Sequence, residues 1–413
     1  MVKRIQILLI LFLLTDIVGF SQENLLTINQ AVETAINNNV ELNQIKTQLS
    51  QKVSLWQNIE ISQPEISYTK EGIGSEEYCS YAEKRITITQ EIEFPLTAVY
   101  RVKALKQEAE AQKYLMKAIE KEIKVDIKSK YINVLYAQYF QESKDNQQKL
   151  LQDLYNVVCN KFEANTENNF NVANMELQLN EAKNDFEQSK LLLRQAKYNL
   201  FNSMGLPLEQ QKRTIKFSDS LSTTNIDFSQ IQAFLEEVIH PGYQSFEHKL
   251  SASNYFLKEA KSKIFPDIRF SYYKQDYGSG FDFNGFEIGL SLPLWQLFEQ
   301  NGEVKNAKGS HKELSIKQQE IVENMNVKIE SAWQKFSDNC TIIDRYENSL
   351  FQKDQEFKTL SLKAYELGEI DLFNLLSAQQ MYYKSQHRYV EAMCDYYLQF
   401  TVFEQYIDTD LVF

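Results

Sequence analysis

The sequence predicts a mainly helical protein with a small β part, built as a tandem duplication. The chain of 413 residues contains only 12 glycines and 6 prolines, and no proline occurs in 96–206 or 294–413. Because proline breaks helix interiors, these two stretches, rich in good helix formers, are expected to form very long helices. In addition, the segment FEANTENNFNV at 162–172 is matched by YELGEIDLFNL at 365–375, half a chain later.

The first proline-free stretch has the apolar spacing of one long amphipathic helix. Apolar residues recur every three or four positions at Met116, Ile119, Ile123, Ile127, Tyr131 and Leu135, and again at Leu150, Leu154, Val158 and Phe162. We therefore expect a helix over about 98–163, on the order of 100 Å long. Helices of this length are typical of coiled coils and helical barrels.

Two shorter segments alternate with period two and predict β-hairpins. Between Pro64 and Pro95, one face carries Ile86, Ile88, Ile92 and Phe94, and the other carries Thr87, Thr89, Glu91 and Glu93. The stretch from Pro266 to Pro293 repeats this pattern around a glycine-containing loop. Each half therefore contributes two strands.

The repeat defines the expected domains. Pro64 aligns with Pro266, EFPL at 93–96 with SLPL at 291–294, and Val40 with Pro241. We expect a first repeat at 22–205, an inter-repeat segment at 206–227 and a second repeat at 228–413. Each repeat reads helix, two strands, very long helix, loop, long helix.

Residues 1–21 have the features of a secretory signal peptide. Lys3 and Arg4 precede an apolar run from residue 5 to residue 14, and Gly19 and Ser21 are small residues before a cut ahead of Gln22. The run is too short for a membrane-spanning helix, although a lone hydrophobic anchor is the alternative. No later stretch reaches 18 apolar residues.

Composition excludes several classes of function. The net charge of −12 and the lack of a basic block argue against a nucleic-acid partner. None of the cysteines and histidines has the spacing of a metal or redox site, so no metal is expected. They are Cys79, Cys159, Cys340, Cys394, His240, His248, His311 and His387. The sequence contains no nucleophile elbow, phosphate loop or convergent acid pair either, so no cofactor and no enzymatic activity are expected.

The four expected strands fit a membrane only if several chains share one barrel. Strands of about ten residues can cross a bilayer, but open sheet edges are not tolerated in lipid. Three chains would supply twelve strands, an even number typical of outer-membrane barrels. A small soluble sheet packed on the helices is the alternative. Aromatic girdles could come from Tyr68, Phe270, Tyr272, Tyr273, Phe281, Phe283 and Phe286.

Six segments in order resemble the TolC family of outer-membrane efflux channels. They are LLTINQAVETAINNNVELNQIK, ITQEIEFPL, NSMGLP, FPDIRFSYYKQ, IGLSLPLW and AYELGEIDLFNLLSAQQMYYKSQHRYVEA. The resemblance covers about 25–410, and Val40 replaces the proline usual in the first segment. The cation-efflux branch is the most similar.

The resemblance implies a fold and a function. The fold is a long α-helical barrel joined to a 12-stranded β-barrel shared by three chains, in the outer membrane and extending into the periplasm. The implied function is export of solutes, metal cations or drugs, with a periplasmic adaptor protein and an inner-membrane pump of the RND type. The alternatives are the outer-membrane component of a type I protein secretion system, or a periplasmic coiled-coil scaffold without a pore.

The two matching loops are the expected adaptor-docking tip, six per trimer. The tip residues are Asn165, Thr166, Gly368, Glu369 and Ile370. Gly368 suits a helix end that needs a left-handed residue, and Asn165 at the matching place tolerates that conformation. The alternative is that these residues form turns only.

The resemblance also implies a pore gate just past the loops. Family members often carry aspartates at positions that correspond here to Asn374 and Ser377, and in the first repeat to Asn171 and Asn174. The chain thus departs from an acidic ring. Asp371 and Glu369 lie nearby and could supply charge instead, although Asp371 is more typical of a helix N-cap.

Overall fold

The structure, a computed structural model, describes residues 25–57, 62–73, 81–211, 216–217, 219, 240–277, 282–291 and 296–406, without the side chains of 210–211 and 296–301. The predicted signal peptide and most of the inter-repeat segment lie outside these residues. The chain divides into two compact units, each drawing on both halves of the sequence. Unit 1 comprises Met1–Asn39, Glu122–Leu235 and Ser331–Phe413, and unit 2 comprises Val40–Lys121 and Glu236–Glu330.

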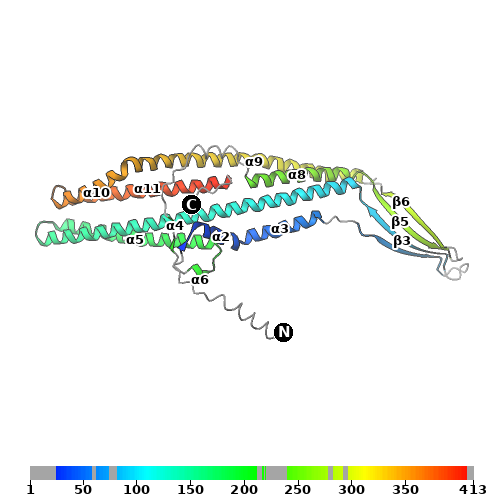
Figure 1. Cartoon of the computed structure of the whole chain (residues 1–413), viewed down its shortest axis with the longest axis horizontal. Helices are drawn as coiled ribbons and strands as arrows, with labels where there is room; N and C mark the ends of the chain where they lie inside the picture. The colour runs from blue at the N-terminus through cyan, green and yellow to red at the C-terminus, as the bar shows by residue number, and fades with distance from the viewer. Residues whose placement is uncertain are drawn as a thin grey trace, which may run out of the picture. The chain divides into compact units, whose positions relative to one another are not determined.

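Unit 2 contains four helices or parts of helices that precede or follow the strands. They are α3 (Val40–Gln57), the first part of α4 (Pro95–Glu163), α8 (Pro241–Ser262) and the first part of α9 (Gln296–Arg345). In Figure 1, α8 runs alongside α4 and α9 within this unit. Pro95 and Pro241 each occupy the first helical position, where a missing N–H costs nothing.

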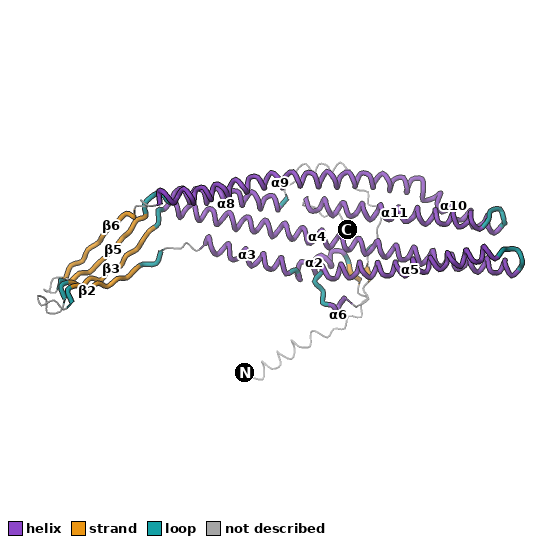
Figure 2. The backbone as a smooth tube through the Cα atoms, turned by 180° about the vertical axis from the view of Figure 1, so that it is seen from behind, coloured by secondary structure: helices purple, strands orange, loops and turns teal. Residues whose placement is uncertain are grey.

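The predicted hairpins form one antiparallel sheet in the order β2-β3-β5-β6. The strands are β2 (Glu65–Glu71), β3 (Glu83–Ile92), β5 (Asp267–Asp276) and β6 (Asp282–Ser291). Figure 2 shows them as four neighbouring strands, with the two hairpins joined through β3 and β5. Two strands from each half of the chain thus confirm the predicted arrangement.

The register places apolar side chains on one face of the sheet. Ile88 faces Ile66 on one side and Tyr272 on the other, and Tyr272 faces Phe286. Since side chains alternate between faces, the members of this apolar face are Ile66, Tyr68, Ile86, Ile88, Ile92, Ile268, Phe270, Tyr272, Phe286, Ile288 and Leu290. The other face is mostly polar, with Thr87, Thr89, Glu91, Arg269, Ser271 and Glu287.

The apolar face is exposed rather than packed on the helices of its unit. Phe286 is 72% exposed, and Ile66, Ile288 and Leu290 are similarly open. Of the aromatic residues expected to form girdles, Tyr68, Phe270, Tyr272 and Phe286 lie on this face. Tyr273 and Phe283 lie on the polar face, which corrects that expectation, and Phe281 lies outside the described residues.

Unit 1 is built from helices of both repeats around an aromatic core. Its helices are α2 (Ile28–Asn38), the rest of α4 and α9, α5 (Asn169–Ser203), α10 (Phe351–Glu366) and α11 (Leu372–Tyr406). Phe336 of α9 packs against Phe400 and Phe403 of α11 with ring centroids 4.9 and 5.5 Å apart. Tyr131 of α4 is fully buried in the same core.

A buried ion pair joins α4 to α11 in this core. Lys128 Nζ lies 2.7 Å from Glu404 Oε2, and both side chains are almost fully buried. Beside it, the hydroxyls of Ser129 and Thr401 are 3.1 Å apart. Removing one member of a buried pair leaves an uncompensated charge, so this contact fixes which faces of the two helices can meet.

Three features of the helices differ from the sequence prediction. The long helix α4 begins at Pro95 rather than near 98, and it ends at Glu163 as expected. The second long helix is interrupted by a π-helical turn, η1 (Tyr346–Leu350), between α9 and α10. The first helix is divided at Asn39, so that α3 begins at Val40, the position aligned with Pro241.

A short parallel pairing was not predicted either. Strand β1 (Leu25–Leu26) pairs with β4 (Lys216–Phe217), and the short helix α6 (Leu208–Gln211) lies between α5 and β4 in the sequence. Both strands are two residues long, and a pattern of that length has no detectable period.

Candidate functional site

The two matching loops lie at the same end of unit 1 (Figure 1), and one apolar cluster joins the helices beside them. We call them tip loop 1 (164–168) and tip loop 2 (367–371). The helix pairs that they join are helical hairpin 1, made of α4 and α5, and helical hairpin 2, made of α10 and α11. The cluster joins Val158 of α4 and Met175 of α5 to Tyr365 of α10 and Leu375 of α11. The structure thus brings together segments that are half a chain apart in the sequence.

Tip loop 1 ends α4 with two backbone hydrogen bonds characteristic of a Schellman motif. The N–H of Asn165 donates to Phe162 O at 3.0 Å, and that of Thr166 donates to Lys161 O at 2.9 Å. Asn165 has φ of 58°, the left-handed conformation that asparagine tolerates better than most residues.

Tip loop 2 ends α10 in the same way. The N–H of Gly368 donates to Tyr365 O at 3.1 Å, and that of Glu369 donates to Ala364 O at 2.8 Å. Gly368 has φ of 74°. The sequence prediction that Asn165 and Gly368 occupy equivalent left-handed positions is therefore confirmed.

The next helix begins in the same manner after each loop. The Asn168 side chain accepts a hydrogen bond from Asn171 N, and the Asp371 side chain accepts one from Asn374 N, each at 2.8 Å. The interpretation of Asp371 as a helix N-cap is confirmed. One oxygen of this exposed carboxylate is thus held by the backbone of α11.

The predicted gate residues occupy the first two turns of α5 and α11. The Asn171 amide donates to Glu167 Oε1 at 2.6 Å, and Asn174 is half-buried. Asn374 and Ser377 are exposed, and Ser377 borders a hollow of about 620 Å³ between the hairpins. An ion pair between Lys144 and Asp185, 2.8 Å apart, lies on its opposite wall. Their assignment to a gate stays a prediction.

Tyr365 joins the ends of α4 and α10 beside the two tip loops. The amine of Lys161 lies 4.1 Å from the centroid of its ring, and Glu167 is close enough to act on its hydroxyl. Burial and the Glu167 charge together raise the pKa of Tyr365, so the phenol stays neutral. The contact between Lys161 and the Tyr365 ring thus joins the end of α4 to the end of α10.

Equivalent positions in the two hairpins are buried unequally. Tyr365 is 5% exposed, whereas Phe162, 203 residues earlier, is 42% exposed (365 − 162 = 203). Conversely, Leu154 is 6% exposed, whereas Phe357, 203 residues later, is 46% exposed (357 − 154 = 203). Each hairpin therefore has one apolar face covered by its sister hairpin and one open face that carries an aromatic residue. Sequence analysis missed this difference, although the repeat alignment pairs these residues.

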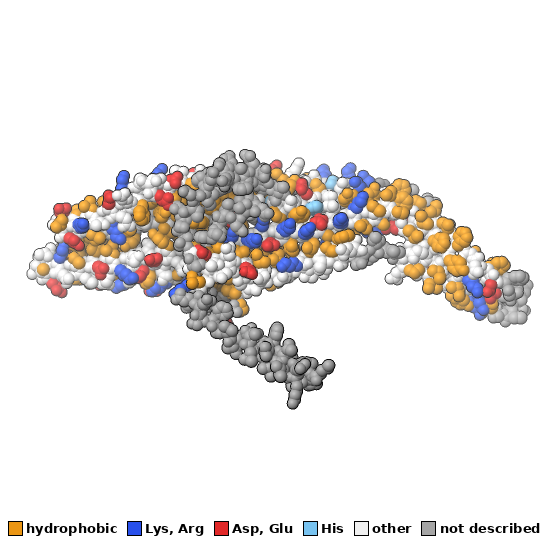
Figure 3. Space-filling view, in the orientation of Figure 1, with side chains coloured by type: hydrophobic (Ala, Val, Ile, Leu, Met, Phe, Trp, Pro, Cys, Tyr) orange, Lys and Arg blue, Asp and Glu red, His pale blue; other side chains and the backbone are white. Residues whose placement is uncertain are grey.

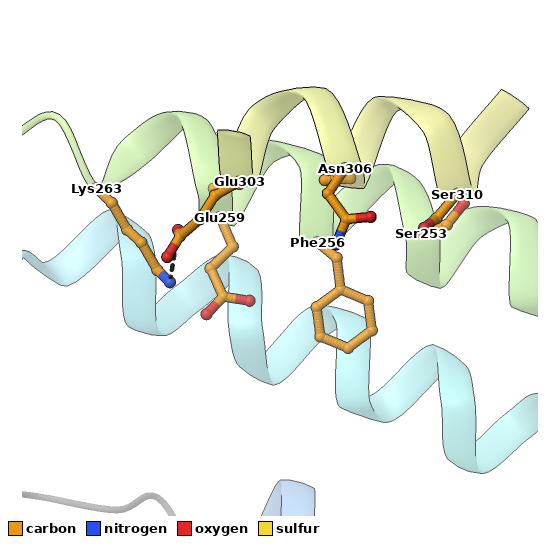
Figure 4. Close-up of a pocket in the computed structure, with 9 residues that line it drawn as sticks. Ser253, Phe256, Glu259, Lys263, Glu303, Asn306 and Ser310 are labelled. Carbon is orange, nitrogen blue, oxygen red and sulfur yellow. Dashed lines mark hydrogen bonds and ion pairs between the residues drawn. The ribbon is translucent and has the colours of Figure 1, made fainter. Parts of the chain in front are cut away.

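The hollow between α8 and α9 in unit 2 is a helix-packing groove (Figure 4). Its charged residues have partners: Lys263 lies 3.1 Å from Glu303, and Glu259 lies 2.8 Å from Arg101. The remaining lining includes Phe256, Asn306 and two serines. Within the described residues, no three His, Cys, Asp or Glu side chains form a group that could hold a metal ion.

No helix in the described part of the chain is both long enough and apolar enough to span a bilayer.

Comparison with known proteins gives a fold but no sequence relative. No family model and no curated protein sequence matches the chain. In structure it is similar to the outer-membrane channel OprN, with a TM-score of 0.76 and 12% identity over 92% of this chain and 89% of that one. It is also similar to the CmeC outer membrane channel of Campylobacter jejuni, with a TM-score of 0.75, 16% identity and coverage of 92% and 86%.

A third similar structure is the outer membrane protein VceC of Vibrio cholerae, with a TM-score of 0.75, 14% identity and coverage of 92% and 95%. The chain therefore has the fold of outer-membrane channels. The resemblance to the TolC family that the sequence motifs indicate is confirmed at the level of the fold.

The paired loops permit a direct test of backbone strain. No atom lies within 4 Å of a Cβ built on Gly368, so Gly368→Ala adds strain without a clash. We expect it to destabilise tip loop 2 by about 1 kcal/mol, which would speed exchange of the Glu369 amide hydrogen about fivefold. Asn165→Gly at the equivalent place removes a side chain from the same conformation, and the Thr166 amide should exchange at nearly the original rate. Equal effects of the two changes would contradict the assignment.

Proposed function

We propose that this protein is an outer-membrane channel that exports solutes as the outer component of a tripartite efflux system. The observation that most strongly supports this proposal is the exposed apolar face of the β2-β3-β5-β6 sheet, in a chain with the fold of outer-membrane channels. Such a face is stable in lipid and unfavourable in water. The opposite, polar face suits the lumen of a pore.

The sheet needs other chains before it can lie in a bilayer. Strands β2 and β6 are its edges, and unpaired backbone groups cost several kcal/mol each in hydrocarbon. Three copies would close twelve strands with no edge left. The proposed assembly is therefore a homotrimer in contact with outer-membrane lipid.

The unequal hairpins support the same assembly. Within one chain, Leu154 of hairpin 1 and Tyr365 of hairpin 2 share an apolar cluster. Their equivalents, Phe357 and Phe162, are on open faces and cannot meet within one chain if the repeat geometry holds. In a ring of six hairpins, Phe357 of one chain would pack near Phe162 of the next. Three duplicated chains would then make six similar contacts.

The tip loops are the proposed docking site for a periplasmic adaptor, with an inner-membrane pump of the RND type beyond it. Thr166, Gly368 and Glu369 are exposed, whereas Ile370 packs partly against the apolar cluster. Exposed Phe170 and Phe373, the second residues of α5 and α11, lie beside the loops at equivalent positions. A hexameric partner could therefore bind a trimer of this chain through six similar sites, two on each chain.

The two rival functions differ in what they require. A periplasmic scaffold without a pore would leave the apolar sheet face in water, so the exposed face disfavours it. Export of proteins in a type I system uses the same architecture and differs in cargo. Conductance of the purified protein across a planar bilayer tests the channel: stepwise currents support it, and a protein that neither inserts nor conducts contradicts it.

Assembly provides a second prediction. Phe162→Ser and Phe357→Ser should each lower the yield of trimer measured by native mass spectrometry, because each removes an aromatic side chain from the proposed inter-chain contact. Val157→Ser is the matched control. Val157 is also 42% exposed, and its equivalent in hairpin 2, Leu360, is exposed as well, so neither is expected at the contact. A trimer yield equal among the three variants would refute the proposed ring.

The gate provides a third prediction. Up to nine amides and three hydroxyls from Asn171, Asn174, Asn374 and Ser377 of three chains would surround the closed end. Neutral groups hydrogen-bond without concentrating multivalent cations, so blockade of conductance by trivalent cations should be weak. The double variant Asn374→Asp with Ser377→Asp should be blocked at much lower cation concentration. Strong blockade of the unchanged channel would instead assign the pore charge to Asp371 or Glu369.

A further inference from the structure

The polar face of the β2-β3-β5-β6 sheet carries an excess of negative charge. Since side chains alternate between faces, its described strands place six carboxylates and two guanidinium groups there, a net charge of −4. The carboxylates are Glu65, Glu71, Glu83, Glu91, Asp267 and Glu287, and the guanidinium groups are Arg85 and Arg269. On the apolar face, Lys70, Lys84 and Lys274 are balanced to within one charge by Asp276 and Asp282, and Figure 3 shows blue and red atoms together at the hairpin-turn end.

Both basic groups of the polar face already have acidic neighbours on the inner strands. Arg85 of β3 lies 2.9 Å from Glu83 of the same strand. Arg269 of β5 lies 3.6 Å from Glu91 of β3. The charges of the inner strands are therefore largely balanced, and the excess belongs mainly to the edge strands.

The edge strands carry carboxylates without a basic neighbour. Glu65 and Glu71 of β2 and Glu287 of β6 are exposed, and none of the three forms an ion pair with another described residue. Glu71 lies opposite a further acid, Glu83. The polar face of the described parts of β2 and β6 contains no lysine or arginine. In the proposed assembly, where these edges meet, the neighbouring chain's edge strand would therefore not neutralise the three carboxylates.

The dimensions of the proposed barrel decide whether these charges act on a passing ion. Twelve strands about 4.8 Å apart and tilted by about 40° make a barrel about 24 Å wide. A glutamate that projects about 5 Å inwards then places its charge about 7 Å from the axis. This distance is within the Debye length of about 10 Å at 0.1 M salt and well beyond that of about 3 Å at 1 M. The charges therefore act across the whole lumen at low salt only.

We propose that Glu65, Glu71 and Glu287 make the barrel lumen selective for cations, so that the charge class of the exported solute is set in the barrel rather than at the gate. Carboxylates that line a pore favour cations, and substitutions in a barrel lumen change selectivity. Glu65 and Glu287 lie in one row, three strand spacings or about 14 Å apart, too far to hold one ion together. The effect is a preference in passage and not ion binding. The inference rests on the proposed function, because it requires the polar face to line a pore.

The test is the reversal potential of the purified full-length protein in a planar bilayer, under a potassium chloride gradient centred on about 0.1 M. The wild-type channel should prefer K⁺ to Cl⁻ about tenfold. The potential scales with the net charge of the face, and the logarithm of the preference scales with the potential. The triple variant Glu65→Gln, Glu71→Gln and Glu287→Gln, which reduces −4 to −1, should therefore lower the preference to about twofold. The wild-type preference should disappear at about 1 M salt.

The matched control removes one charge from the other face of the same strand. Glu287→Gln should lower the preference to about fivefold, whereas Asp282→Asn, also exposed on β6, should leave it unchanged. This pair decides the question if the triple variant does not assemble.

Equal loss in the two single variants overturns the proposal. So does a triple variant as selective as the wild type, which would assign selectivity to Glu369 or Asp371 of tip loop 2. A wild-type protein that conducts without preferring cations refutes only this inference, whereas one that does not conduct refutes the proposed function.

Discussion

Ten exposed apolar side chains lie on one face of the four-stranded sheet, and the helices of the same unit, as far as the structure describes them, do not cover them. The need to remove them from water constrains everything else in the proposed assembly. A lipid environment would cover the face, but the same environment excludes the open edges β2 and β6. In the proposed assembly the chain would be incomplete alone, and its copies would supply both the missing strands and the missing helix neighbours.

The tandem duplication explains how copies of one chain could supply these neighbours, because each chain carries two similar helical hairpins. Both tip loops have the same local structure. A residue in the left-handed conformation is followed three residues later by a polar N-cap, and the third residue of the next helix is an asparagine. Yet Tyr365 is buried and Phe162 is open, since the sister hairpin covers only one side of each pair. If the helical hairpins belong to a ring of six, a single chain would show this pattern: two hairpins of the same backbone geometry, with equivalent residues buried in one and exposed in the other.

Much of the fold could be predicted because its boundaries have local causes. Pro64, Pro95 and Pro266 cannot lie in helix interiors, and period-two alternation determined which strand residues share a face. Gly368 and Asn165 were recognisable for the same reason, since few residues tolerate a left-handed backbone. Asp371 was recognisable as an N-cap from its place ahead of an apolar helix.

The remaining features depend on neighbours that are distant in sequence. The Lys128–Glu404 pair joins residues 276 positions apart, and no local pattern marks it. The π-helical turn at Tyr346–Leu350 contains neither glycine nor proline, so no helix-breaking residue marks it in the sequence. Tyr272 and Tyr273 are neighbours in one strand and so point to opposite faces, but only the register with Ile88 and Phe286 showed that Tyr272 is the one on the apolar face.

The measurement that tests the central claim most directly is the environment of this adjacent pair. A nitroxide attached to a keto-bearing aromatic residue at position 272 or 273 leaves the four cysteines intact, and its relaxation can be measured in lipid bilayers. The account predicts that the label replacing Tyr272 contacts dissolved oxygen but not a water-soluble nickel chelate, and that the label replacing Tyr273 shows the reverse. Equal access of the nickel chelate to both positions would contradict a sheet with one face in lipid and the other lining a pore.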